Sequence, residues 1–212
     1  MNLFVIGDVH GCCKTFQSLL EHWDCNNEIL IQLGDLIDRG NHVPQTVKLV
    51  RAIQKKYHNA FFLKGNHEAA AIGYLNNKTN NWHERFGKDV LWQYALNESD
   101  FTNDVEWFKQ MPLYWENEYV FVSHAGISKS LFCMEESHPE GILLNRGILK
   151  NIGKLQVIGH TPQKKASYMA NSNSWNIDTG AFMGKKLTGI KLKENGEFIE
   201  LISQATFNAD VS

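Results

Sequence analysis

The first third of the chain alternates apolar runs with segments in which apolar residues recur every three or four positions. The runs NLFVI, EILIQL and AFFL, at residues 2–6, 28–33 and 60–63, predict three strands. Between them, the spacing of apolar residues over 16–23 and 43–57 predicts two helices, each with one buried face. Strands separated by helices of this length indicate βαβ units with parallel strands.

The rest of the chain predicts more strands around a polar and aromatic segment. Residues 77–110 combine helical fragments with turn residues, and we interpret them as a small helical lobe inserted beside the site. Its Trp82, Trp92, Trp107 and Phe108 are interpreted mainly as core residues. Further strands are predicted at 155–160 and 174–180, and hairpins turning at 116–117 and 195–196. We therefore expect one domain over residues 1–212, of the α/β (α+β) class.

Composition narrows the class of protein. The 212 residues are 43% hydrophobic and 21% charged, which is typical of a soluble globular domain. A net charge of -2 gives no support for a nucleic-acid partner. No run approaches the ~18 apolar residues of a membrane helix, and the opening MNLFVIGD lacks a signal-peptide pattern, so we expect a cytoplasmic protein without membrane association. The cysteines lack CxxC spacing and are interpreted as reduced: Cys12, Cys13, Cys25 and Cys133.

Five of the predicted strands end in short polar motifs. These are GDVHG (7–11), GDLIDRG (34–40), GNHE (65–68), SHAG (123–126) and GHTP (159–162). The carboxyl ends of parallel strands face one crevice in an open α/β sheet, so side chains from distant parts of the chain can converge there. The candidate metal ligands in these motifs are Asp8, His10, Asp35, Asn66, His124 and His160.

This mixture of imidazole, carboxylate and amide groups suits Mn, Fe, Zn or Ni better than Ca, which prefers oxygen ligands alone. Six ligands exceed what one tetrahedral zinc requires, so we expect two divalent metal ions that share a carboxylate. Two ions ~3.5–4 Å apart can clamp a phosphoryl group and activate water. Isolated histidines are more often surface or hydrogen-bonded residues, and we interpret His22, His42, His58, His83 and His138 in that way.

With these motifs in view, the chain resembles the calcineurin-like metallophosphoesterases and, within them, the PPP-type serine/threonine protein phosphatases of bacteria and phages. GDxHG, GDxxDRG and GNHE carry the resemblance, which runs from Gly7 to Gly180. It implies a β-sandwich of two mixed sheets with helices outside and a dinuclear metal centre at the strand ends. Manganese is the first expectation for the metal.

The resemblance also implies a role for each residue of the motifs. Asp8, His10 and His160 would hold one metal, Asn66 and His124 the other, and Asp35 would bridge the two.

Catalytic roles are implied for four further residues. His67 would be the general acid, and Asp38 would pair with it and raise its pKa. Arg39 and Arg146 would bind the phosphate oxygens, and the less favoured alternative for Arg146 is an ordinary surface arginine.

Two neighbours of the GNHE motif have other interpretations. We interpret Glu68 as a first-turn carboxylate favoured by the helix dipole. Close relatives in this family usually carry arginine at the position of Lys64. Lysine keeps the positive charge but lacks the planar guanidinium group that can form two parallel hydrogen bonds.

The sequence therefore predicts a metal-dependent phosphomonoester hydrolase, first of all a protein serine/threonine phosphatase. A metal-bridging hydroxide would attack phosphorus directly, and the substrate would be a phosphorylated protein or a small phosphoester. The alternative is a symmetrical diadenosine tetraphosphate (dinucleoside polyphosphate) hydrolase. A nuclease or phosphodiesterase is disfavoured by the lack of basic excess. A non-catalytic phosphoprotein-binding module is disfavoured because His67 and Asp38 are both present. Nothing in the pattern indicates an oligomeric state.

Overall fold

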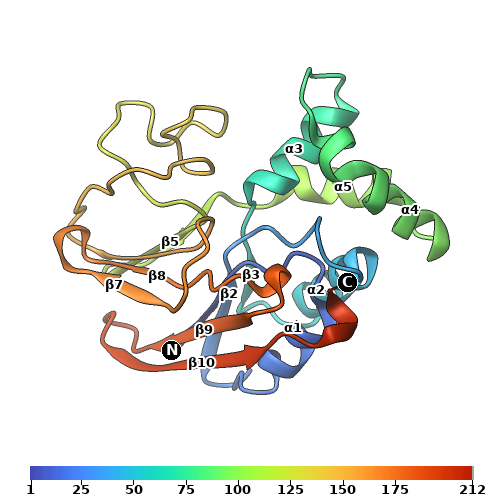
Figure 1. Cartoon of the computed structure of the whole chain (residues 1–212). Coiled ribbons are helices and arrows are strands. Elements are labelled where there is room, and N and C mark those ends of the chain that lie inside the picture. Colours follow the sequence, from blue (N-terminus) through green and yellow to red (C-terminus); the bar gives the residue numbers. More distant parts are fainter. Residues whose placement is uncertain (212) are drawn as a thin grey trace.

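A computed structural model describes residues 1–211 and contains two five-stranded sheets. The first sheet has the order β10-β9-β1-β2-β3 (Figure 1). β1, β2 and β3 are parallel, as the βαβ pattern predicts, and β9 is antiparallel to both β1 and β10. The strands of this sheet are β1 (Asn2–Ile6), β2 (Glu28–Gln32), β3 (Ala60–Phe62), β9 (Lys186–Leu192) and β10 (Phe198–Ala205).

The second sheet has the order β4-β5-β6-β8-β7. Its three central strands are parallel, and β4 and β7 close its two edges in antiparallel pairs. Its strands are β4 (Tyr114–Glu116), β5 (Val120–Ser123), β6 (Leu155–Ile158), β7 (Ser167–Met169) and β8 (Ser174–Asn176). The three-residue β7 was missed because SYM is too short to show alternation.

The alternation of side chains along β1 assigns its two faces to two different cores. Leu3 and Val5 point toward the second sheet, where they belong to one cluster with Val122 and Val157. Phe4 belongs instead to the cluster beneath the helices. Because both faces of the strand are covered, an almost continuous apolar run is what a buried parallel strand requires.

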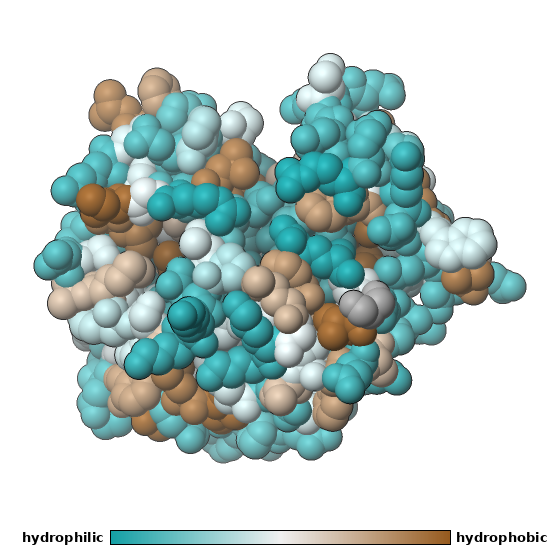
Figure 2. All heavy atoms as spheres, in the orientation of Figure 1, coloured by the Kyte–Doolittle hydropathy of each residue, from teal (hydrophilic) through white to brown (hydrophobic). Residues whose placement is uncertain are grey.

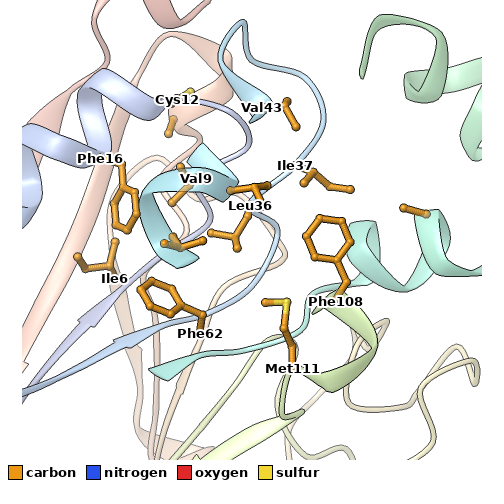
Figure 3. Close-up of a cluster of buried hydrophobic side chains, with 14 of the residues drawn as sticks. Ile6, Val9, Cys12, Phe16, Leu36, Ile37, Val43, Phe62, Phe108 and Met111 are labelled. Atoms are coloured by element: carbon orange, nitrogen blue, oxygen red, sulfur yellow. The ribbon is translucent and has the colours of Figure 1, made fainter. Parts of the chain in front are cut away.

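Helices cover the outer face of the first sheet and form the projection at the upper right of Figure 1. Buried residues of these helices and of the sheet form one cluster, which includes Phe16, Phe62, Phe108 and Met111 (Figure 3). The helices are α1 (Cys13–Leu20), α2 (Val43–Lys56), α3 (Asn66–Leu75), α4 (Lys88–Leu96) and α5 (Phe101–Gln110). A π-helical turn occupies His83–Gly87, and short 3₁₀ turns lie at Ala170–Ser172, Ala181–Met183 and Asn208–Asp210.

The predicted fold class is thus confirmed: two mixed sheets packed face to face, with helices outside. The predicted hairpins are present as β4–β5 and β9–β10. The strand predicted over 174–180 is shorter and ends at Asn176, which leaves Asp178 in the loop that follows. No helix within residues 1–211 is long and apolar enough to cross a membrane.

Candidate metal centre and catalytic site

The candidate ligands other than Asn66, which is the first residue of α3, lie in loops directly after strands, and several of them adopt an unusual backbone. His10, Asp35 and His160 have φ angles of 48°, 53° and 66°, in the left-handed region that residues with side chains seldom occupy. Asp38 and Arg39 share this conformation, with φ angles of 70° and 71°. Such strain persists only where the surrounding structure fixes the backbone, and it concentrates at functional sites.

Asp35 lies at the centre of the site. Its Oδ2 atom is 3.4 Å from His10 Nε2, 3.5 Å from His124 Nε2 and 3.8 Å from His67 Nε2. The carboxylate is 2% exposed, so water does not screen these contacts. Burial alone would raise the pKa of Asp35, but His124, His67, His10 and His160 together lower it below its ordinary value.

The orientation of the imidazoles shows that lone pairs face one another. His10 Nδ1 lies 2.9 Å from the Ile37 carbonyl oxygen, and His124 Nδ1 lies 3.0 Å from that of Leu33. A carbonyl only accepts, so each Nδ1 carries the proton and each Nε2 presents a lone pair. These lone pairs point at the Asp35 carboxylate.

A second set of acceptors surrounds His124. Its Nε2 atom lies 3.0 Å from Asn66 Oδ1 and 3.1 Å from His160 Nδ1. Asp8 accepts the His160 backbone N–H through Oδ2 at 2.9 Å, while its own Oδ1 is buried and without a partner among the described residues, as is His160 Nε2. Acceptors that converge without hydrogens between them are stabilised by a cation, so these residues fit divalent metals. The His160 ring lies with His124 and Asn66, whereas the resemblance implied that His160 shares a metal with Asp8 and His10.

Burial and crowding shift the pKa values of Asp8 and His160 in opposite directions. Burial, and then Asp178 and Asp35, raise the pKa of Asp8 well above its usual range. Burial and the neighbouring His124 lower the pKa of His160 to about 3, so its imidazole is neutral and able to ligate a metal.

Two glycines allow this close packing. A Cβ on Gly159 would lie 2.0 Å from Asp8 Oδ1, and one on Gly65 would lie 2.2 Å from Asp35 Oδ1. Any side chain at these positions would therefore displace a candidate ligand.

His67 lies within reach of Asp35 but is held by other residues. Its Nδ1 atom bonds Asp38 Oδ2, and its Nε2 atom lies 3.5 Å from an Arg39 guanidinium nitrogen. Burial lowers the pKa of His67, but Asp35 and Asp38 outweigh that effect and leave the pKa above its ordinary value. This geometry suits the proton donor implied by the resemblance, and the role remains a prediction.

The two arginines line the same small cavity, of about 40 Å³, with His10, Asp35 and His160. The Arg39 guanidinium lies 4.1 Å from the centre of the Phe182 ring and 5.1 Å from that of Phe86. These rings hold the arginine in place by cation–π contact and packing. Arg146 Nη1 donates to the His160 carbonyl at 3.3 Å and to Thr161 Oγ1 at 3.2 Å. The structure therefore places Arg146 at the cavity and not on a remote surface.

Sequence reasoning missed Asp178. This residue is 2% exposed and lines the cavity, and Gly180 donates its backbone N–H to Asp178 Oδ1 at 3.0 Å. Burial raises its pKa to about 6. The signal was present in the sequence, because Asp178 follows β8 much as Asp8 follows β1.

Trp82 is a second missed residue, because we interpreted it only as core. It is indeed buried, and its ring stacks on Phe101 with centroids 5.5 Å apart. Its indole N–H also donates to both carboxylate oxygens of Asp38, at 3.1 and 2.9 Å. Trp82 therefore links the segment at 77–110 to the Asp38–His67 pair, a contact that spacing along the chain could not reveal.

Glu68 accepts hydrogen bonds from a neighbouring loop in addition to its predicted interaction with the helix dipole. It is in the first turn of α3, where its carboxylate accepts the N–H of Gly65, the N-cap of the helix, at 2.8 Å. The same carboxylate also accepts the backbone N–H groups of Asp35, Leu36 and Ile37 at 2.9, 2.8 and 3.3 Å. Glu68 thus fixes the loop that carries the central carboxylate.

The chain is similar in sequence to bacterial proteins and in fold to a solved structure. It is 26% identical to a bis(5'-nucleosyl)-tetraphosphatase PrpE [asymmetrical] of Oceanobacillus iheyensis, over 99% of this chain and 96% of that protein. It is 28% identical to the protein of the same name from Bacillus thuringiensis subsp. konkukian, over 92% of each chain. The structure of a candidate diadenosine tetraphosphatase superposes with a TM-score of 0.72 at 18% identity, covering 98% of this chain and 94% of that one. That likeness shows the fold.

The model of one protein family matches residues 1–192, which is most of the chain and includes every candidate ligand. The superfamily suggested by the sequence motifs is confirmed, whereas the protein phosphatase subtype gains no support from relatives named as tetraphosphatases. The chain belongs to the calcineurin-like phosphoesterase family.

Proposed function

We propose that this protein is a metal-dependent dinucleoside tetraphosphate hydrolase. The observation that carries the proposal is the likeness to asymmetrical bis(5'-nucleosyl)-tetraphosphatases over 99% of the chain, with the acceptor cluster around Asp35 intact. The alternative considered from the sequence was symmetrical cleavage of the same kind of substrate. The names of the relatives favour asymmetrical cleavage, into a nucleoside monophosphate and a nucleoside triphosphate.

The residues of the cavity support phosphoric anhydride hydrolysis. Two divalent cations, when bound, would supply Lewis-acid stabilisation of phosphate oxygens and an activated water. Arg39 and Arg146 line the cavity and are placed to bind the oxygens of the attacked phosphate. His67 has Nε2 near Arg39 and Nδ1 on Asp38, so it can give a proton to the departing oxygen. Manganese is the metal we would supply first, with Fe, Zn and Ni as alternatives.

Protein phosphatase activity was the first prediction from the sequence, because GDxxDRG and GNHE occur together. Both motifs are accounted for by the geometry whatever the substrate. Asp38 and Arg39 serve the His67 side of the cavity, and Glu68 fixes the Asp35 loop. The motif pair therefore describes the metal centre and does not by itself identify the leaving group that is attached to the phosphate.

The test compares three substrates with purified, manganese-loaded protein: diadenosine tetraphosphate, a phosphoserine peptide and p-nitrophenyl phosphate. We expect kcat/KM for the dinucleotide to exceed that for the peptide by more than about tenfold, or about 1.4 kcal/mol of transition-state stabilisation. A preference for the phosphopeptide of the same size would overturn the proposal and restore the protein phosphatase hypothesis. A His67→Asn variant purified in parallel controls for contaminating phosphatases, since loss of a general acid lowers turnover by about 10²–10⁴-fold.

A further inference from the structure

The catalytic cavity is too small to hold more of a substrate than the phosphate group that reacts. Its volume is about 40 Å³, close to that of one or two water molecules, so most of any dinucleotide must lie outside it. Two grooves adjoin this cavity, one through Asn66 and the other through Arg146. We propose that the grooves hold unlike halves of the substrate: the first takes a triphosphate, and the second takes the nucleoside attached to the attacked phosphorus. The inference rests on the proposed function and adds to it the direction in which the substrate lies.

The first groove, here called the lysine groove, has a volume of about 620 Å³ and is lined by Lys64, Lys78 and Lys109. It lies between α3 and the loop that contains Glu136, where Figure 2 shows the surface hollowed beside the projecting helices. Because Asn66 lines both the lysine groove and the cavity, a chain of phosphates can pass directly from one to the other.

The charges of the lysine groove favour a polyanion. Lys64 is only 7% exposed, and its Nζ atom lies 3.3 Å from Glu136, the one acidic residue of the lining in residues 1–211. Lys109 pairs with Glu106, which lies outside the lining, whereas no ion pair involves Lys78 in the described part of the chain. Lysines act as compact point charges toward phosphate and need no fixed fork geometry, so they suit successive phosphates of a flexible chain. This is also a role that the Lys64 side chain can fill where relatives of the family usually carry arginine.

The second groove has different chemistry. Its volume is about 460 Å³, and apart from Arg146 its lining within residues 1–211 has no charged side chain. We call it the amide groove, after the residues Asn145, Asn171, Asn176 and Gln163 that line it. Ile148, Leu149 and Met169 supply apolar surface beside these amides.

An uncharged nucleoside matches this lining. Carboxamides can donate to and accept from the edge of a base, and apolar side chains can cover its face. The Asn171 side chain is exposed to the groove and makes no hydrogen bond within the described residues. The amide groove therefore retains unused hydrogen-bonding capacity, but it has only one cation to offer a phosphate chain.

Together the grooves dictate which bond breaks. The oxygen of water forms a bond to the phosphorus that carries the nucleoside in the amide groove. The bond from this phosphorus to its bridging oxygen breaks, and that oxygen leaves with its electron pair as the terminal oxygen of a nucleoside triphosphate in the lysine groove. His67 gives its proton to that departing oxygen, and the proton released by the attacking water goes to solvent, from which His67 is protonated again. Symmetrical cleavage would place two phosphates on each side, for which grooves of such unequal charge are poorly suited.

Hydrolysis of diadenosine tetraphosphate in water enriched in oxygen-18 tests this direction in the wild-type protein. We expect the label in adenosine monophosphate, with unlabelled adenosine triphosphate as the other product. Label in the triphosphate would reverse the two halves and overturn the inference, although the proposed function would stand. Formation of two adenosine diphosphates would do the same. Cleavage of p-nitrophenyl phosphate without cleavage of the dinucleotide would overturn the proposed function, and the inference with it.

A lysine variant tests the assignment of the triphosphate. Lys78→Met removes an exposed charge of the groove without touching a candidate metal ligand. We expect kcat/KM for the dinucleotide to fall about tenfold more than that for p-nitrophenyl phosphate, mainly through KM, as loss of a charge-assisted contact predicts. Lys48→Met, an exposed lysine on α2 outside both grooves, is the matched control and should not change this ratio. Equal losses for the two substrates in Lys78→Met would overturn the assignment.

Discussion

The strand-end loops and the helical segment at 82–110 contribute to the site in different ways. The loops supply every candidate ligand except Asn66, which begins α3, and they hold His10, Asp35 and His160 in left-handed backbone conformations. The helical segment supplies no acceptor to the cluster around Asp35. It instead reaches Asp38 through the indole N–H of Trp82.

This difference suggests a division of labour. Metal binding depends on loops whose backbones are fixed by the sheets, whereas the proton-donating and phosphate-binding side chains depend partly on the helices. Phe86 reinforces the second half of this division, because its ring contacts both His67, at 4.9 Å between centroids, and Arg39. Variants in the loops should therefore lose metal, and variants in the helical segment should keep metal while turnover falls.

The largest effect is expected for Asp35→Asn. The substitution removes the negative charge that three imidazoles approach within 4 Å, so both metal sites lose their shared carboxylate. We expect less bound manganese after dialysis and at least about a 10³-fold loss of kcat, because metal ions contribute several kcal/mol to transition-state stabilisation. Asp89→Asn, on the exposed face of α4, is the matched control. Full metal content in Asp35→Asn, measured by mass spectrometry, would contradict the central position of this carboxylate.

Glu68→Gln tests whether the Asp35 loop is fixed from α3. The buried carboxylate accepts four backbone N–H groups, and a glutamine would turn an NH₂ toward some of them. We expect a loss of about 2–4 kcal/mol in the free energy of unfolding, since charged acceptors are replaced and donors are left unpaired. Burial and Asp35 raise the pKa of Glu68 to about 7, so urea titrations belong at pH 8, where the carboxylate is ionised.

The matched control for this variant is Glu21→Gln, an exposed carboxylate just after α1. If both substitutions changed the urea midpoint equally, Glu68 would have no special role in the loop.

The sequence predicted the strands well, and the candidate ligands that it named meet in the folded chain, because both depend on local patterns. Apolar runs located β1, β2 and β3, and the polar residues after each run are the ones that meet at Asp35. The same rule applied to β8 would have found Asp178.

Contacts between distant side chains were not predictable in this way. Trp82 and Asp38 lie 44 positions apart, and an indole ring in an amphipathic segment has the pattern of an ordinary core residue. The bonds from Glu68 to the Asp35 loop also required the relative placement of two loops. The grooves beside the cavity combine residues from α3, α5 and the loops after β5 and β6, so their charges emerge only in the folded chain.

Trp82→Phe should separate the two regions most clearly. Phenylalanine keeps the stacking on Phe101 and removes only the N–H that both oxygens of Asp38 accept. We expect unchanged manganese content and about a tenfold lower kcat, the typical effect of losing a hydrogen bond to a charged group. The decrease in kcat should be larger for phenyl phosphate than for 2,4-dinitrophenyl phosphate, because the leaving group of the second substrate needs no proton.

Trp107→Phe is the matched control, since Trp107 lies in the same helical segment and its indole N–H donates to Gln54 of α2. Equal losses with good and poor leaving groups would show that Trp82 serves only the core and not the Asp38–His67 pair.

The smallest effect is expected for Asp100→Ala, which weakens the helical segment without touching the site. Asp100 is the N-cap of α5, where its side chain accepts the Asn103 backbone N–H at 3.0 Å. Loss of such a cap costs about 1 kcal/mol, visible as a lower urea midpoint. Because α5 packs Phe108 into the main core while no strand-end loop contacts this cap, manganese affinity and kcat should not change. Weaker metal binding in this variant would mean that the helices support the ligand loops as well as the proton donor, and that the division between the two regions is not real.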